Sequence, residues 1–171
     1  MDLAERYAGE APYPTAADFE QAFVYMFNEQ RRRAYNSTDG LTDSEINQDP
    51  GHGGWSIGEI LAHQLNLLRF MAETMAPGST AHLPQSKIGV AGARNLDAII
   101  AEREILWDHL ETVFAKMAPD ELLGKRPNLN PAGWADWPVL MRFLRPLIDY
   151  ATHIGQVNYA RRQLGNPVKR V

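Results

Sequence analysis

Residues 55–63 read WSIGEILAH and contain the best-defined helix start in the sequence. Ser56 and Glu59 have the spacing of a capping box, in which the two side chains satisfy backbone N–H groups that the first helical turn leaves without partners. Pro77 follows the apolar pattern shortly after Met75, and a proline there cannot continue the helix. The segment therefore predicts a helix that begins after Ser56 and ends at Met75.

Three other stretches repeat apolar residues at the spacing of amphipathic helices. They cover residues 16–36, residues 96–117, where Pro119 ends the pattern, and residues 138–164, where Gly165 closes it. The first has a stripe that favours a core position: Phe19, Phe23, Met26 and Phe27. No segment alternates apolar and polar residues as a strand would. The sequence thus predicts an all-α protein, a four-helix bundle with long connecting loops.

The composition is that of an ordinary globular protein. The chain has 171 residues, of which 44% are hydrophobic and 22% are charged, values that allow a sizeable core. We expect a single domain over residues 1–171, with an irregular N-terminal arm over residues 1–14 that contains two prolines.

The charge pattern and the absence of cysteine narrow the function classes. The net charge is -4, with acidic and basic residues interspersed, so nucleic acid is not expected as a direct partner. The densest basic run, residues 31–33, points in three directions on a helix and is expected to form a solvated, salt-bridged face. No signal-peptide core or membrane-spanning stretch is visible, which favours a cytoplasmic location without membrane contact. Without thiolates, any metal would be held by nitrogen and oxygen.

Two segments could supply such a metal site. Asp149 and His153 are four residues apart in the last predicted helix, so both side chains leave the same face. His63 falls at the edge of the apolar face of the helix over residues 57–75 and can point toward the bundle interior. Two imidazoles and a carboxylate suit zinc, nickel, manganese or ferrous iron, and three protein ligands leave positions open for catalysis.

Simpler interpretations of these residues exist. His63 could be a core-edge histidine hydrogen-bonded to an oxygen atom. Arg145 lies four residues before Asp149, so the two could form an intrahelical ion pair without any metal. An aspartate and a histidine four residues apart are also common by chance in helices.

Other residues could contribute to the same site. His52, in a glycine-rich loop, could act as a fourth ligand or a general base, although a loop histidine more often faces solvent. Gln156, Arg145, Tyr150 or a tryptophan indole could orient the ligands or a substrate. The remaining histidines are interpreted as a loop residue, His82, and a surface residue, His109.

Residues 55–63, followed after one intervening helix by residues 149–156 (DYATHIGQ), resemble the DinB/YfiT-like family of metal-binding four-helix proteins. The order of the helices and residues 161–165 (RRQLG) are also similar to that family. The resemblance implies that His63 and His153 are metal ligands. The third ligand of the family is usually a histidine at the position of Asp149, and carboxylates are expected there in some branches.

The resemblance also implies a function. It favours a metal-dependent enzyme that acts on a small-molecule substrate, by thiol-dependent transfer or isomerisation or by hydrolysis, with zinc or nickel expected first and a low-molecular-weight thiol as a second cofactor. A basic pocket rim from Arg142 or Arg145 would favour an anionic thiol, and a dry apolar pocket a neutral substrate. The alternative is a non-enzymatic, stress-related four-helix protein that serves in ligand binding or dimerisation and has a degraded metal site. A homodimer is expected, with Trp134 and Trp137 as spare aromatic residues.

Overall fold

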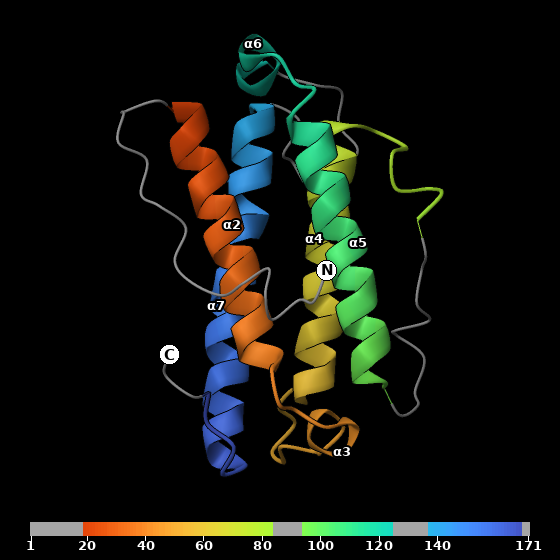
Figure 1. Cartoon of the computed structure of the whole chain (residues 1–171), viewed down its shortest axis with the longest axis vertical. Coiled ribbons are helices and arrows are strands. Elements are labelled where there is room, and N and C mark those ends of the chain that lie inside the picture. Colours follow the sequence, from red (N-terminus) through yellow and green to blue (C-terminus); the bar gives the residue numbers. More distant parts are fainter. Residues whose placement is uncertain (1–18, 84–93, 125–136, 169–171) are drawn as a thin grey trace.

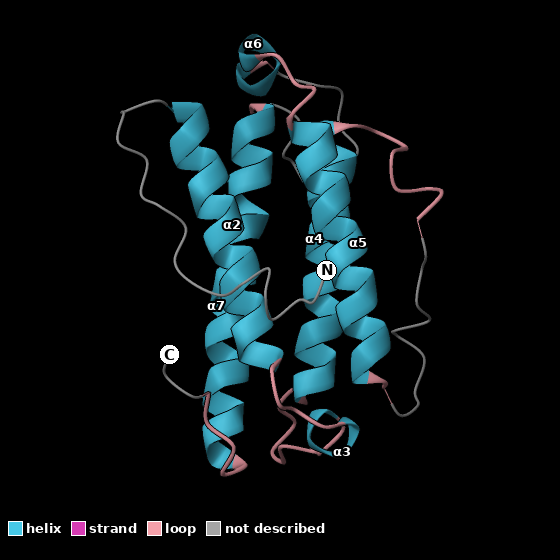
Figure 2. Ribbon diagram, in the orientation of Figure 1, coloured by secondary structure: helices cyan, strands magenta, loops and turns pink. Residues whose placement is uncertain are grey.

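The computed structural model describes residues 19–83, 94–124 and 137–168, and over these residues it is helical without strands (Figures 1 and 2). The all-α four-helix prediction is confirmed, with two additional short helices. None of the helices in the described ranges is long and apolar enough to cross a membrane. The helices are α2 (Phe19–Thr38), α3 (Asp43–Ile46), α4 (Ile57–Met75), α5 (Leu96–Phe114), α6 (Pro119–Leu123) and α7 (Val139–Gln163).

The four long helices lie side by side, with α4 in contact with both α5 and α7, and α2 in contact with α7. Figure 1 shows that α4 and α5 run in one direction and that α2 and α7 run in the opposite one. Because α4 and α5 are parallel, α4 ends at one end of the bundle and α5 begins at the other. Helices α3 and α6 lie at opposite ends of the bundle.

The helix ends follow their local signals closely. Helix α4 begins with the predicted capping box, in which the Ser56 hydroxyl accepts from the Glu59 N–H and the Glu59 carboxylate accepts from the Ser56 N–H. Helix α7 ends before Gly165, whose φ of 77° is a conformation that glycine adopts without strain. The predicted start of the first helix at residue 16 lies outside the described residues. Helix α5 ends at Phe114, three residues before the predicted end at residue 117, and Pro119 begins the separate short helix α6.

Not every residue of the apolar stripe predicted for the first helix is buried in the core. Phe23 stacks on Phe114 with ring centroids 4.4 Å apart, and Phe27 meets Trp107 edge to face at 4.6 Å. Met26, expected in the same stripe, is 44% exposed. The reason is the helical period: positions 23 and 27 are four residues apart and share a face, whereas position 26 is turned away from that face by about 100° relative to position 27.

The helical period also explains why the expectation of a solvated face is wrong for Arg31, the first of three consecutive arginines. Arg31 lies four residues after Phe27 and is 2% exposed, and its guanidinium donates to Glu104 at 2.8 Å and to Asp108 at 2.7 Å. Arg32 does form the expected partly exposed pair, with Glu29 at 2.8 Å. A buried charge needs partners, and α5 supplies the carboxylates that sequence spacing alone does not place beside Arg31.

Two helical glycines provide a matched test of this packing. A Cβ atom on Gly58 would lie 2.9 Å from the carbonyl oxygen of Ile46 and 2.7 Å from Cδ of Arg94, whereas a Cβ on Gly155 would meet nothing within 4 Å. Gly58→Ala should lower the free energy of unfolding by about 1–3 kcal/mol because α3 must move. Gly155→Ala should raise it by about 0.5–1 kcal/mol. Urea denaturation measures both, and a Gly58→Ala variant as stable as the parent would contradict the close approach of α3 to α4.

Candidate metal centre

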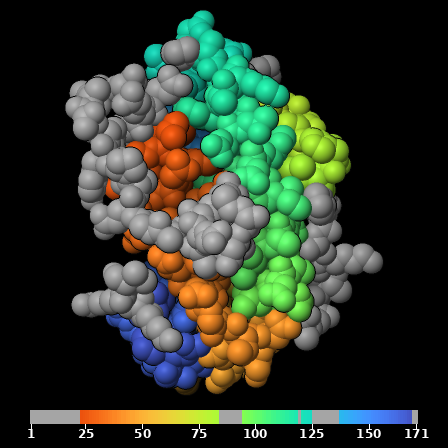
Figure 3. Space-filling model, viewed as in Figure 1, coloured from red at the N-terminus to blue at the C-terminus, as the bar shows by residue number. Residues whose placement is uncertain are grey.

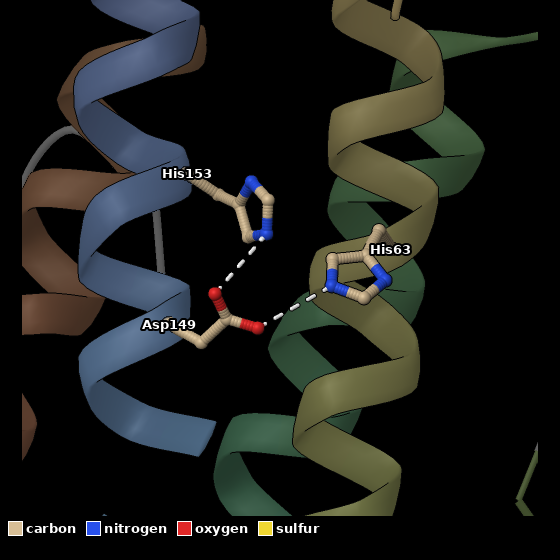
Figure 4. Close-up of side chains that lie close together, drawn as sticks. All are labelled: His63, Asp149 and His153. Carbon is tan, nitrogen blue, oxygen red and sulfur yellow. Dashed lines mark ion pairs between the residues drawn. The ribbon is translucent and has the colours of Figure 1, made fainter. Parts of the chain in front are cut away.

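His63, Asp149 and His153 come together between two packed helices. His63 lies on α4, and Asp149 and His153 lie one turn apart on the facing side of α7, with the carboxylate between the two imidazoles (Figure 4). One carboxylate oxygen is 3.6 Å from Nε2 of His63, and the other is 3.6 Å from Nε2 of His153. One donor atom from each residue lies within 4.8 Å of the others. The structure thus brings together the three residues that the sequence analysis named as candidate ligands.

A hydrogen bond beside the cluster joins the two helices. The Gln64 side chain, 1% exposed, donates to the backbone carbonyl of Tyr150 at 3.3 Å. Gln64 follows His63 and Tyr150 follows Asp149 in the sequence, so this bond ties the two backbones together next to the donor atoms. The register of α4 against α7 is thereby linked to the geometry of the cluster.

The spacing of the donors suits a shared cation better than direct hydrogen bonds. A distance of 3.6 Å between nitrogen and oxygen exceeds the range of roughly 2.7–3.2 Å for a hydrogen bond. Two donors that share a tetrahedral zinc ion at about 2.1 Å lie about 3.4 Å apart. Small side-chain rotations would bring all three donors to that distance, so the residues present fit a divalent metal.

The simpler interpretations of the cluster find less support. Within the described part of the chain, the Asp149 carboxylate pairs with His63 and His153. Over the same residues it forms no ion pair with Arg145, whose side chain is exposed. The Asp149 oxygen that approaches Nε2 of His63 lies 3.6 Å away, which is beyond hydrogen-bond distance. The side chains of His63, Asp149 and His153 are 33%, 46% and 10% exposed, so the donors remain open to an arriving ion.

Gln156 orients His153, as the sequence suggested that it could. Its side-chain oxygen lies 2.7 Å from Nδ1 of His153. An amide oxygen can only accept a hydrogen bond, so Nδ1 of the neutral imidazole carries the proton and Nε2 presents its lone pair toward Asp149. Metal-binding histidines commonly have such a partner, which holds the ring and its tautomer in place.

Trp55 forms an aromatic wall beside the cluster, a role that the sequence did not reveal. Its indole is 52% exposed, with its ring centroid 5.3 Å from that of His63 and 6.0 Å from that of His153, to which it lies nearly parallel at 16°. In the sequence, Trp55 directly precedes Ser56, the N-cap residue of α4. Only the packing of α7 against α4 brings His153 beneath the indole, and no local pattern signals that contact.

A cavity of about 1000 Å³ lies next to this centre, between the segment that joins α3 to α4 and the second half of α7. His153 and Gln156 are part of its wall, and His63 and Asp149 are not. His52 also lines the cavity but does not belong to the donor group. Neither Arg142, which is 3% exposed, nor Arg145 lines it, so the predicted basic rim is not found among the described lining residues.

A second pair of histidines lies away from the metal centre and corrects the prediction of a surface His109. His109 is half-buried, its Nε2 lies 3.0 Å from the Ser79 hydroxyl, and its ring centroid is 5.7 Å from that of His82. Burial lowers the pKa of His109, and the nearby His82 adds to that effect. His82 is an exposed turn residue, in agreement with its interpretation as a loop position.

These features define a class of protein: a four-helix bundle with a candidate metal centre of two histidines and one carboxylate. Residues 26–157 match the family described as the DinB superfamily. This match covers well over half of the chain, and the chain therefore belongs to the DinB superfamily.

Known proteins with the same fold include a DinB-like protein from Bacillus cereus, with a TM-score of 0.64, 17% identity, and coverage of 88% of this chain and 96% of that one. A conserved protein from Enterococcus faecalis has a TM-score of 0.53, 16% identity, and coverage of 86% and 97%. The uncharacterized protein YuaE of Bacillus subtilis is 30% identical over 74 residues, which is 41% of this chain and 46% of that relative. The match thus spans about half the length of this relative.

The hydrogen bond from His153 to Gln156 can be tested without a metal. In metal-free protein with the His153 imidazole in its neutral form, the ¹⁵N shifts of this ring should report a proton on Nδ1. Gln156→Leu removes the acceptor and should move the proton toward Nε2. Gln163→Leu, on the same cavity wall, should leave the tautomer unchanged. If the tautomer of His153 did not change in Gln156→Leu, the hydrogen bond between His153 and Gln156 would be contradicted.

Proposed function

We propose that this chain is a metal-dependent enzyme that acts on a small molecule bound in the cavity beside His153. The observation that carries the proposal is the convergence of three donors from α4 and α7 within 4.8 Å, with one of them on the cavity wall. Membership in the DinB superfamily supports a metal-binding role. Zinc or nickel suits two imidazoles and one carboxylate, and manganese or iron is also compatible.

The residues around the centre have distinct tasks in this proposal. A bound metal would supply Lewis acidity, either to activate water for hydrolysis or to hold a thiolate for transfer. Gln156 keeps Nε2 of His153 available as a ligand. The Trp55 indole stacks on the His153 imidazole and makes an edge contact with the His63 imidazole. The open wall at His153 lets a molecule in the cavity reach the centre. Because the chain has no cysteine, a thiol would have to come from a second small molecule.

We also propose that the chain forms a homodimer. Met141 and Ile148 are 46% and 65% exposed and lie seven residues apart on α7, so they share one outward face. Trp137, the other described aromatic expected to contribute, is 37% exposed, and Trp134 lies outside the described residues. An apolar face of this kind on a bundle helix is suited to burial against a second copy.

Metal analysis tests the proposed centre directly. Tag-free protein should carry about one divalent metal per chain, and His63→Ala and His153→Ala should each reduce it to background. Free metal at about 100 times its dissociation constant should stabilise the parent by about 2.7 kcal/mol and leave these variants unaffected. Asp149→His should retain metal because imidazole is also a good ligand. His52→Ala and His109→Ala serve as controls.

The result of the metal analysis also distinguishes a metal-dependent enzyme from a non-enzymatic helical bundle. The enzyme proposal would lose its basis if the parent protein held no stoichiometric metal and if added zinc and nickel did not change its thermal stability. The cavity would then favour a ligand-binding role.

Light scattering coupled to size-exclusion chromatography tests the proposed dimer. Met141→Glu places like charges opposite each other across a two-fold interface and should shift the protein toward a monomer at micromolar concentration. Val24→Glu introduces the same charge at a 40% exposed apolar position on α2 and should leave the mass unchanged. A monomeric parent protein would refute the dimer proposal.

A further inference from the structure

The cavity beside His153 lies at the end of the bundle where α3 meets α7. Figure 3 shows the orange surface of the α2–α3 region and the blue surface of α7 next to each other at this end. The contact is fixed by Asn166, whose side chain donates to Glu45 at 2.8 Å and to the carbonyl of Gly40 at 3.1 Å. The wall that faces His153 is therefore built by residues far from α7 in the sequence.

The described cavity lining contains two carboxylates, and its other ionisable side chains are His52, His153 and Tyr159. Glu45 and Asp49 contribute two carboxylates, and no lysine or arginine belongs to the described lining. Hydrogen bonds from Asn166 and Thr42 lower the pKa of Glu45, so its carboxylate is charged at neutral pH. Arg161 lies behind Glu45 and its charge also lowers the pKa of Glu45. Its side chain is 3% exposed and donates to the carbonyls of Ser37 and Asn166, so the guanidinium is not part of the cavity surface.

Two aromatic side chains complete the wall. Trp55 is 52% exposed and Tyr159 is 65% exposed, and both line the cavity. Aromatic faces attract cations as well as flat organic groups. A cavity with two carboxylates, two accessible aromatic rings and no lysine or arginine in its described lining favours a positively charged organic ligand over an anionic one.

We propose that the cavity selects a small organic molecule that carries an ammonium group, with Asp49 and Glu45 as the residues that determine the charge preference. The ammonium group lies near these two carboxylates and the organic body lies against Trp55, which directs the rest of the molecule toward His153. This inference rests on the proposed function, since it describes the substrate class of the same site. It also disfavours an anionic thiol as the molecule that occupies this cavity.

Three ring compounds of matched size and different charge test the preference: benzylamine, benzyl alcohol and benzoate. The full-length, metal-free protein is titrated with each at low ionic strength, and the indole N–H signal of Trp55 is followed by NMR after assignment with Trp55→Phe. Benzylamine should bind about fivefold more tightly than benzyl alcohol, and benzoate more weakly than both, because each exposed ion pair is worth a few-fold in affinity. Added salt should reduce the preference.

Conservative variants identify the carboxylates responsible. Asp49→Asn retains the acceptor for the Gly51 N–H, and Glu45→Gln can retain the capping box of α3. Each should weaken benzylamine binding about twofold to fivefold and leave benzyl alcohol unchanged. Asp120→Asn, an exposed carboxylate on α6 at the opposite end of the bundle, makes the same charge change and should alter neither.

The possible outcomes separate this inference from the metal proposal. Equal affinity for benzylamine and benzoate, an unchanged preference in both cavity variants, or no response of Trp55 to any probe would overturn the substrate class. Metal content is measured on the same preparations. Protein that holds metal without a charge preference refutes the substrate class alone, and protein that prefers benzylamine but holds no metal refutes the metal centre alone.

Discussion

The packing of α4 against α7 is the contact on which the rest of the molecule depends. Gln64 donates to the backbone carbonyl of Tyr150 next to the donor residues, and the apolar faces of both helices are buried in the same core. A shift of one helix by a single turn, about 5.4 Å, would separate His63 from Asp149 and His153. The distances of 3.6 Å in the cluster therefore depend on a helix interface and not on a loop.

The candidate metal ligands lie on the long helices α4 and α7, whereas part of the cavity wall is formed by loop residues. Residues between α3 and α4 form one side of the cavity, and α7 forms the other. The polar contacts of Asn166 and Arg161 hold the chain after α7 against the α2–α3 connection. The metal donors thus lie on the scaffold, while the residues that contact a ligand lie partly on loops, an arrangement in which loop changes alter specificity and leave the metal donors in place.

Local sequence signals predicted the helix ends well because capping and helix termination depend on a few neighbouring residues. The start of α4 after Ser56 and the end of α7 before Gly165 are examples. Side-chain environments were less predictable. Arg31 is buried because α5 places Glu104 and Asp108 beside it, and His109 is half-buried because Ser79 lies next to it. Neither partner is adjacent in the sequence, so neither contact has a local signal.

The amino-acid sequence by itself determined the four amphipathic helices, their ends, and the placement of Asp149 and His153 on one face of α7, because helical period and capping are local properties. The tertiary structure alone decided that His63 meets that face and that the Trp55 indole contacts both imidazoles. It also decided that Asp49, Glu45 and His153 line one cavity, with no lysine or arginine in the described lining. These relationships depend on how distant segments pack, and packing is set by the shape of the whole core rather than by any short stretch of sequence.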